Sequence, residues 1–234
     1  SSGNVTKTYD GLLSAAGTAV VTVGTLYNNA SNSGALDSIG GGTFAFTNAN
    51  AGSANKTVTA SGVVVTDGNS GDNYNVSYAN NTASTINPFV VNLTGTRIYN
   101  GTTVINTGDL TIGTLVGSET LALGGTGSVL SKHVADGKTV DVTGLNLVGD
   151  GTGGAGLAGN YSFTGGTQTV NITKANLAVS TSDVSKTYNG SLTAAGTAVV
   201  AAGGTQLFDT DSLSGGGFAF TNANVGSGNK TVTT

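Results

Sequence analysis

The stretch "GGTFAFTNANAGSANKTVT" (residues 41–59) returns with few changes near the end of the chain, as "GGGFAFTNANVGSGNKTVT" (residues 215–233). The segments "TFAFT" (43–47), "KTVTA" (56–60) and "YNVSY" (74–78) alternate apolar or aromatic with polar residues. Such alternation with a period of two is typical of half-buried β-strands. No window of a dozen residues has the periodicity and caps of an amphipathic helix. The sequence therefore predicts an all-β fold.

Further motifs recur at a fixed spacing, which is the signature of a tandem array. Tyr9, Tyr99 and Tyr188 lie 90 and 89 residues apart, and each is followed by Asp or Asn and then Gly. We predict three units: residues 1–88, which lack a first strand, residues 89–175, which are complete, and residues 176–234, which stop before their last strands. The pattern indicates a window of about two and a half repeats from a longer chain.

The spacing within a unit predicts its architecture. Gly, Asn, Asp and Ser clusters separate short predicted strands at intervals of about ten residues. This predicts tandem β-sandwich-like repeats of about 90 residues, Ig-like or of a related mostly-β topology, with a smaller curved sheet as the alternative. The connections at residues 84–91 and 170–179 are short and strand-like and contain no flexible Gly/Ser run. We therefore expect stiff joints and an elongated rod.

The composition excludes several classes of function. Only 9% of residues are charged and the net charge is -4, so no basic face can follow a nucleic-acid backbone. The absence of Cys removes disulfides and thiolate sites, and no run of 18 apolar residues predicts membrane insertion. His133 is the only histidine, and no Gly-x-Ser-x-Gly elbow occurs. We expect no enzyme, no catalytic residue and no cofactor.

The repeated tyrosine motif predicts a tight turn, because Asp, Asn and Gly accept positive φ most readily. A general base needs its carboxylate in every working copy, and two of the three copies carry an amide. We therefore interpret the motif as a structural bend rather than a catalytic site. Its three copies are Tyr9-Asp10-Gly11, Tyr99-Asn100-Gly101 and Tyr188-Asn189-Gly190.

Six of the eight cationic residues occupy only two repeat positions. One interpretation is that they grip an anionic glycan at regular intervals. The other is that lysines at strand ends discourage edge-to-edge pairing between neighbouring rods, and the Thr/Val-rich sequence favours this second interpretation. The two sets are Lys7, Arg97 and Lys186 before the tyrosines, and Lys56, Lys138 and Lys230 opening the Lys-Thr-Val segments.

The loop "DGNSGDN" (residues 67–73) has oxygen-bearing side chains spaced as in a calcium loop, with Asp67, Asn69 and Asp72 as candidate ligands. It lacks a bidentate Glu, and the second unit has a glycine-rich run at this place. The pattern favours a turn without metal. Asp209 and Asp211, in "LFDTDS", have no carboxylate or His partner close in sequence and are predicted to be solvated loop acids.

The order of the motifs resembles a known family. The sequence "KTYDG" (residues 7–11), the Lys-Thr-Val segments, "GDNYNV" (71–76) and "STIN" (84–87) together are similar to the YDG and MBG repeats of large secreted bacterial adhesins, many of them filamentous-haemagglutinin-like. The resemblance implies an extracellular, secreted or cell-surface-attached stalk of a Gram-negative-type bacterium, in adhesion or a biofilm matrix. The implied partners are neighbouring repeats, with host or matrix glycans as further candidates.

Two other functions remain open at this point. In a carbohydrate-binding module, Tyr74, Tyr78 and Tyr161 would stack on sugars beside Asn side chains. In a self-assembling filament, strands missing from the outer units would be supplied by neighbouring chains through strand addition.

Overall fold

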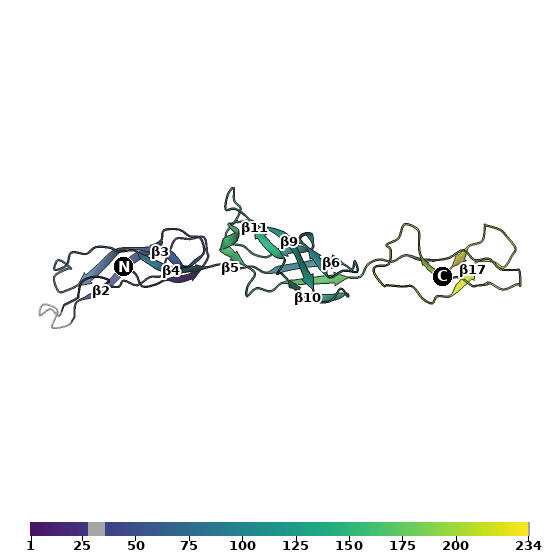
Figure 1. The fold of residues 1–234 in the computed structure, drawn as a ribbon, viewed down its shortest axis with the longest axis horizontal. Coiled ribbons are helices and arrows are strands. Elements are labelled where there is room, and N and C mark those ends of the chain that lie inside the picture. The colour runs from purple at the N-terminus through teal and green to yellow at the C-terminus, as the bar shows by residue number, and fades with distance from the viewer. Residues whose placement is uncertain (28–35, 234) are drawn as a thin grey trace.

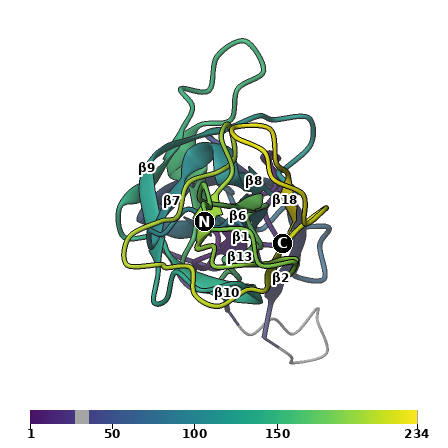
Figure 2. The ribbon, with the colours of Figure 1, turned by 90° about the vertical axis from the view of Figure 1, so that its right-hand side faces the viewer.

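The computed structural model describes residues 1–27 and 36–233. It shows three units placed end to end along one long axis (Figure 1), and a view along that axis shows them behind one another (Figure 2). The predicted all-β repeat fold is confirmed, because the described residues form strands, loops and two short 3-10 turns, but no α-helix. Within the described part of the chain, therefore, no helix is long and apolar enough to span a membrane.

The first unit contains one curled sheet in the order β1-β4-β3-β2. Strand β1 runs parallel to β4, whereas the two other pairings are antiparallel. The long β2–β3 hairpin carries the alternation that the repeated stretch predicts, with Phe44, Phe46 and Val58 facing the core. The strands are β1 (Thr6–Thr8), β2 (Ser38–Phe46), β3 (Gly52–Thr66) and β4 (Asn81–Asn87).

The strand predicted at residues 74–78 does not form. In the second unit, the equivalent residues make β12 (Tyr161–Ser162), which pairs in parallel with β5 (Phe89–Val90). The described chain holds no counterpart of β5 in the first unit, so the segment around Tyr74 has no neighbouring backbone to pair with. Alternation was present there, but a strand also needs a partner for its N–H and C=O groups.

The second unit has the largest sheet, in the order β11-β9-β10-β13-β6-β8, with β7 paired to β9. Strand β6 runs parallel to β13, as β1 does to β4. The strands of this sheet are β6 (Leu93–Ile98), β7 (Val104–Asn106), β8 (Leu110–Ile112), β9 (Ala122–Val129), β10 (Ala135–Asp141), β11 (Leu145–Val148) and β13 (Thr169–Thr173); the 3-10 turns are η2 (Thr107–Asp109) and η3 (Ala158–Asn160).

The third unit has fewer and shorter strands, in a two-stranded and a three-stranded sheet. Residues 182–192, which include the third tyrosine motif, form no strand, because residues 182–233 contain no counterpart of β4 or β13 to pair with them. The strands are β14 (Val179–Thr181), β15 (Thr193–Ala194), β16 (Ala198–Val200), β17 (Phe218–Phe220) and β18 (Val232–Thr233).

The first core crosses the boundary between two units. Only Pro88 separates β4 from β5, and the fixed φ of proline keeps this connection extended. Val91 and Tyr161 of the second unit pack with buried residues of the first unit in one hydrophobic cluster, so the joint is part of a continuous core. The buried members of that cluster are Val5, Tyr9, Phe44, Phe46, Val58, Ile86, Val91 and Tyr161. A second cluster, including Leu93, Ile105, Val170 and Ile172, lies inside the second unit.

Candidate functional site

The repeated Tyr-Asp/Asn-Gly motif forms the same bend in each unit. The side-chain oxygen of Asp or Asn accepts a hydrogen bond from the backbone N–H two residues later, which closes an Asx turn. The Gly that follows has a positive φ, which other residues adopt only with strain. The N···O distances are 2.9, 3.1 and 3.0 Å for Asp10–Leu12, Asn100–Thr102 and Asn189–Ser191, and φ is 75°, 74° and 72° at Gly11, Gly101 and Gly190.

A repeated basic side chain binds oxygen atoms of this bend. Lys7 Nζ donates to Asp10 Oδ1 at 2.6 Å and to the carbonyl oxygens of Leu12 and Ser14 at 2.6 and 3.1 Å. The same ammonium lies 5.5 Å from the centre of the Phe46 ring, within the range of a cation–π contact. In the third unit, Lys186 makes the matching contacts with Asn189, Ser191, Thr193 and Phe220. The basic side chain therefore ties its own turn together.

The second unit reaches the same result with arginine. Val129 replaces the phenylalanine of the other units, so there is no ring for an ammonium to cover. Arg97 is buried and donates to the carbonyl oxygens of Thr102, at 2.8 Å, and Val104. The longer, forked guanidinium thus bridges two loop carbonyls where the aromatic partner is missing.

The second set of basic residues lies mostly inside the sheets. Lys56 is in β3, between β4 and β2, and donates to Asn48 at 3.0 Å; Lys138 is in β10, between β9 and β13. Lys230 donates to Asn222 in the same way. The expectation that these lysines protect sheet edges is wrong for Lys56 and Lys138, because neither strand is an edge strand.

We predict that Gly101→Val destabilises the chain by about 1–3 kcal/mol, because valine would be strained at this positive φ. Its Cβ would also lie 2.6 Å from Phe208 Cβ of the third unit. Thermal unfolding measures the effect, with Gly108→Val as a control at a glycine that has open space around it. Asp10→Asn keeps the acceptor oxygen and should change stability by less than about 1 kcal/mol. A large loss from Asp10→Asn would contradict the structural role of the bend.

The first joint is organised by one carboxylate, Glu119. Tyr9 of the first unit donates its hydroxyl to Oε1 at 2.5 Å, and Tyr161 of the second unit donates to Oε2 at 2.6 Å. Both tyrosines are 5% exposed, and their rings meet edge to face at 5.6 Å. The backbone N–H of Val116 donates to the Tyr161 hydroxyl oxygen at 3.2 Å. Glu119 thus joins a tyrosine of each unit through its two oxygens.

A pair of asparagines seals the side of this joint. Asn160 is 2% exposed, and its Oδ1 accepts from the backbone N–H of Ala51 at 2.8 Å. Its Nδ2 donates to Asn50 Oδ1 at 3.1 Å. Asn50 and Ala51 belong to the first unit and Asn160 to the second, so the repeated Asn-Ala-Asn loop is a second contact across the boundary.

The two tyrosines of the first joint, Tyr9 and Tyr161, have raised pKa values. Burial and then the hydrogen bond to Glu119 raise the pKa of Tyr9 and of Tyr161 above the ordinary value of 10.0, because a phenolate would be desolvated beside a carboxylate. A group whose pKa is raised on folding stabilises the fold below its unfolded pKa and loses that contribution as the pH rises through its folded pKa. The joint should therefore be intact at neutral pH and weaken above pH 10.

We predict a lower melting temperature at about pH 11 than at about pH 8, measured by circular dichroism. The double variant Tyr9→Phe/Tyr161→Phe lacks the two titrating hydroxyls and should lose less stability over the same interval. An equal loss in both proteins would show that the alkaline sensitivity arises elsewhere.

The second joint repeats the tyrosine–carboxylate contact. Tyr99 Oη donates to Asp211 Oδ2 at 3.0 Å, and the Tyr99 ring meets Phe208 edge to face at 5.7 Å. Lys132 forms an ion pair with Asp209 across the same boundary. Asp209 and Asp211 are exposed loop acids, as predicted, and the partners that the sequence did not indicate, Lys132 and Tyr99, come from the preceding unit.

A repeated acidic motif explains both joints and was missed in the sequence. Each carboxylate is followed by Ser or Thr and then by Ile or Leu, and Glu119 and Asp211 lie at the end of their unit that contacts the preceding one. The copies are Asp37-Ser38-Ile39, Glu119-Thr120-Leu121 and Asp211-Ser212-Leu213. Comparison of the three units could have revealed this motif. The loops before it differ in length, so its copies do not recur at a fixed spacing.

The loop at residues 67–73, which was considered as a calcium site, is organised by its own backbone. Asp67 is fully buried; its Oδ1 accepts from the N–H groups of Asn69 and Gly71 at 2.8 Å each, and its Oδ2 from Asn73 at 3.1 Å. Burial by itself would raise the pKa of Asp67, but these amide donors lower it below the usual value. In residues 1–27 and 36–233, no three His, Cys, Asp or Glu side chains are arranged to hold a metal ion.

We predict that a chelator leaves the melting temperature unchanged within about two degrees, because backbone amides already occupy the Asp67 carboxylate. Calorimetry with and without chelator, followed by added Ca²⁺, measures this. A drop that Ca²⁺ reverses would establish Asp67, Asn69 and Asp72 as a metal site.

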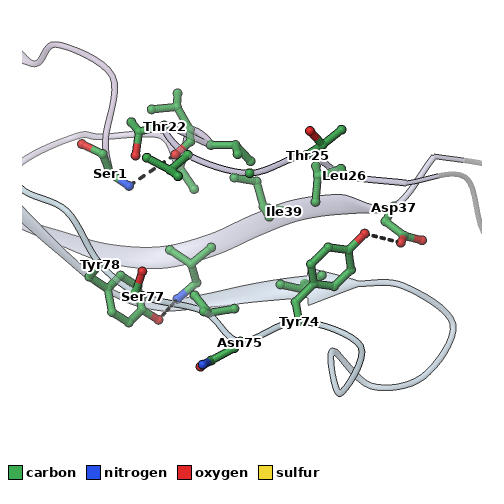
Figure 3. Close-up of a pocket in the computed structure, with 18 of the residues that line it drawn as sticks. Ser1, Thr22, Thr25, Leu26, Asp37, Ile39, Tyr74, Asn75, Ser77 and Tyr78 are labelled. Carbon is green, nitrogen blue, oxygen red and sulfur yellow. Dashed lines mark hydrogen bonds between the residues drawn. The ribbon is translucent and has the colours of Figure 1, made fainter.

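Of the three tyrosines considered for sugar stacking, Tyr74 and Tyr78 line one hollow of the first unit (Figure 3), whereas Tyr161 lies in the first joint. The sugar-stacking role considered for Tyr161 is wrong, since its ring is buried in the first joint. Tyr74 donates to Asp37 at 2.7 Å, and Tyr78 accepts from the N–H of Val63 at 3.1 Å, at the opposite end of the first unit. His133 is an exposed loop residue.

Comparison with protein-family models identifies the repeats. The YDG domain matches three times, over residues 1–83, 82–170 and 173–234, so that almost the whole chain is covered. Neither the curated proteins nor the solved structures give a match. Three consecutive matches, each with a Tyr-Asp/Asn-Gly bend, show that this chain belongs to the YDG domain family.

Proposed function

We propose that this chain is a structural stalk segment of an extracellular bacterial adhesin or matrix protein, which spaces and displays other regions away from the cell. The single observation that carries the proposal is the first joint, where Glu119 accepts hydrogen bonds from Tyr9 and Tyr161 inside a continuous core. A spacer must resist bending between units, and a buried, hydrogen-bonded joint does this better than a flexible linker.

The low charge and the absence of Cys support the same function. A chain without cysteine folds outside the cell without redox chemistry, and stability then depends on each unit and each contact with its neighbour. In the described residues, the repeated basic side chains of the bend are directed at their own turns, which favours a spacer over a surface that grips anions.

Small-angle scattering tests the mechanical part of this proposal. We expect an elongated particle with a maximum dimension of about 100 Å or more, since strands of about 3.3 Å per residue give each β unit roughly 40 Å along the axis. A profile close to that of one compact 234-residue domain would overturn the stalk.

Labelling of intact producing cells tests the location. Antibodies raised against this chain should bind cells that have not been permeabilised, and external protease should remove the signal. Signal only after permeabilisation would overturn the extracellular role. A glycan array probed with the isolated chain should show no specific binding if the segment only spaces, whereas saturable binding would favour a carbohydrate-binding module.

A further inference from the structure

The second unit pairs the strands at its entry with the strands at its exit, and both pairs are parallel. The chain enters this unit at β5 and leaves it after β13, at the opposite end of the unit (Figure 1). Strand β5 runs beside β12, and β6 runs beside β13, in the same direction in each case. Together they form one line of contact between residues 89–99 and residues 161–173, which we call the seam.

Hydrogen bonds cross the seam along its whole length. The two parallel ladders supply some of them, and further contacts lie between the ladders and beyond their end. The seam is therefore continuous, although each ladder is short. These further contacts, with N···O distances of 2.9, 2.7 and 2.9 Å, run from the N–H of Val91 to the Ser162 carbonyl, from the N–H of Thr167 to Asn92 Oδ1, and from the N–H of Tyr99 to the Thr173 carbonyl.

A buried glutamine joins the two ladders. Gln168 is 7% exposed, and its Oε1 accepts a hydrogen bond from the N–H of Leu93 at 2.7 Å. Its Nε2 donates to the carbonyl oxygens of Val91, at 3.0 Å, and Phe163, at 3.2 Å. The side chain thus binds the backbone on both sides of Asn92, where the chain passes from β5 to β6.

The seam lies inside the second unit. Strands β13 and β6 are neighbours in the sheet, and each has another strand on its far side, β10 and β8 respectively. Val91 and Leu93 are 0% exposed, and Val170 and Ile172 are 1% exposed. Water that could compete for a stretched hydrogen bond is therefore excluded, and the low local dielectric strengthens each bond.

Tension along the chain loads this seam in shear. Because β6 and β13 are parallel, the force enters at the start of β6 and leaves at the end of β13, so it slides one strand along the other. The hydrogen bonds of a ladder cross the gap between strands, at a large angle to this movement, so they share the force and break almost together. Strands that are pulled apart from one end instead lose their bonds one after another, at a lower force.

The first unit contains the same parallel pair, since β1 runs beside β4. The N–H of Tyr9 donates to the carbonyl oxygen of Asn87 at 2.8 Å, which matches the contact of 2.9 Å from Tyr99 to Thr173. The tyrosine of the bend thus ends the parallel pairing in both units. The arrangement is therefore a feature of the repeat.

We propose that the seam is a mechanical clamp, which keeps the second unit folded under tension until its hydrogen bonds break together. Resistance to force depends on the unfolding barrier rather than on the equilibrium free energy of unfolding. The use of the clamp in a stalk rests on the proposed function, because a stalk that displays other regions is pulled along its axis. The mechanics of the seam does not depend on that function.

Single-molecule force measurements in two pulling directions test the clamp on the full-length chain. The chain has no Cys, so two introduced thiols define where the DNA handles attach. Asn87→Cys/Lys174→Cys loads the seam in shear. Ile98→Cys/Lys174→Cys peels β6 from β13, because Ile98 is paired with Thr173 at the same end of the seam. The substituted positions are all exposed, so neither pair should alter folding.

We expect the second unit to unfold at a force at least about twofold higher in shear than in peeling, because the bonds break together in one direction and singly in the other. The gain in length at each event identifies the second unit. Equal forces in the two directions would overturn the clamp.

Variants within the seam show which bonds share the force. Gln168→Ala should lower the force in shear, whereas the peeling force depends on the bonds near Ile98 and should change little. Asn92→Ala removes one side-chain bond of the seam and should act in the same way, with a smaller effect. Asn146→Ala, at an exposed position of the edge strand β11, is the matched control and should alter neither force.

A loss that is the same fraction in both directions would also overturn the clamp, because it would mean that Gln168 and Asn92 only stabilise the unit. If Gln168→Ala does not fold, Asn92→Ala decides by itself, since Asn92 is exposed. The handles set the direction of pulling, so the result is independent of the stalk. A compact particle in scattering would overturn the stalk and leave the comparison of the two forces intact, whereas an elongated particle with equal forces would overturn only the clamp.

Discussion

Replacing Glu119 with alanine is expected to destabilise the first joint by about 2–5 kcal/mol. The change leaves the hydroxyls of Tyr9 and Tyr161 without an acceptor in a buried site, and each unsatisfied group costs about 1–3 kcal/mol. Hydrogen exchange should then become faster at residues 89–91, and calorimetry should show the first unit unfolding apart from the second. Scattering should also report a wider range of lengths, because the joint bends.

Two variants control for the effect of Glu119→Ala. Glu119→Gln keeps one acceptor oxygen and adds a donor, so it should cost about 1 kcal/mol. Asp136→Ala removes an exposed acid from the same unit and should change stability by less than about 0.5 kcal/mol. If Glu119→Ala behaved like Asp136→Ala, the hydrogen bonds of the joint would not be what couples the units.

Replacing Phe46 with alanine is expected to cost about 3–5 kcal/mol, the usual range for a buried aromatic residue cut back to alanine. Phe46 is 1% exposed and belongs to the core that crosses the first joint. Its ring also supports the Lys7 ammonium, so the variant removes packing and loosens the Tyr9 turn together. Urea unfolding followed by circular dichroism measures the loss.

Phe46→Leu separates the two contributions. Leucine keeps most of the apolar contact but has no ring for the cation, so the expected loss is about 1–2 kcal/mol. Phe220→Ala tests the equivalent place in the third unit, where the ring is 9% exposed and the core is smaller, and it should cost less than Phe46→Ala. Equal losses at both places would show that the shared core of the first joint adds nothing to stability.

The joints explain why one motif can be both a turn and a connector. The Asx turn and the basic side chain shape the loop within its own unit, and this shape presents the tyrosine to the acid of the next unit. Arg97 in the second unit preserves the arrangement with a different side chain. The replacement of lysine by Arg97 therefore changes which side chain holds the bend. The backbone shape of the bend is the same in all three units.

The sequence by itself determined the features that depend on a few neighbouring residues. Alternation in residues 43–47 and 56–60 predicted strands there, which the structure shows within β2 and β3, because a period of two leaves one face apolar. The Asn-Gly and Asp-Gly steps predicted positive φ at Gly11, Gly101 and Gly190, where only glycine avoids strain. The repeat spacing predicted an array of all-β units.

Only the tertiary structure decided which groups meet. Tyr9 and Glu119 lie 110 residues apart, and Tyr99 and Asp211 lie 112 apart, so neither motif indicates its partner until the units are stacked. The segment at residues 74–78 alternates like a strand but forms none, because pairing depends on a neighbouring backbone. Local patterns restrict the backbone within a unit, whereas the joints depend on packing between units, and that packing is not encoded in any short stretch of the chain.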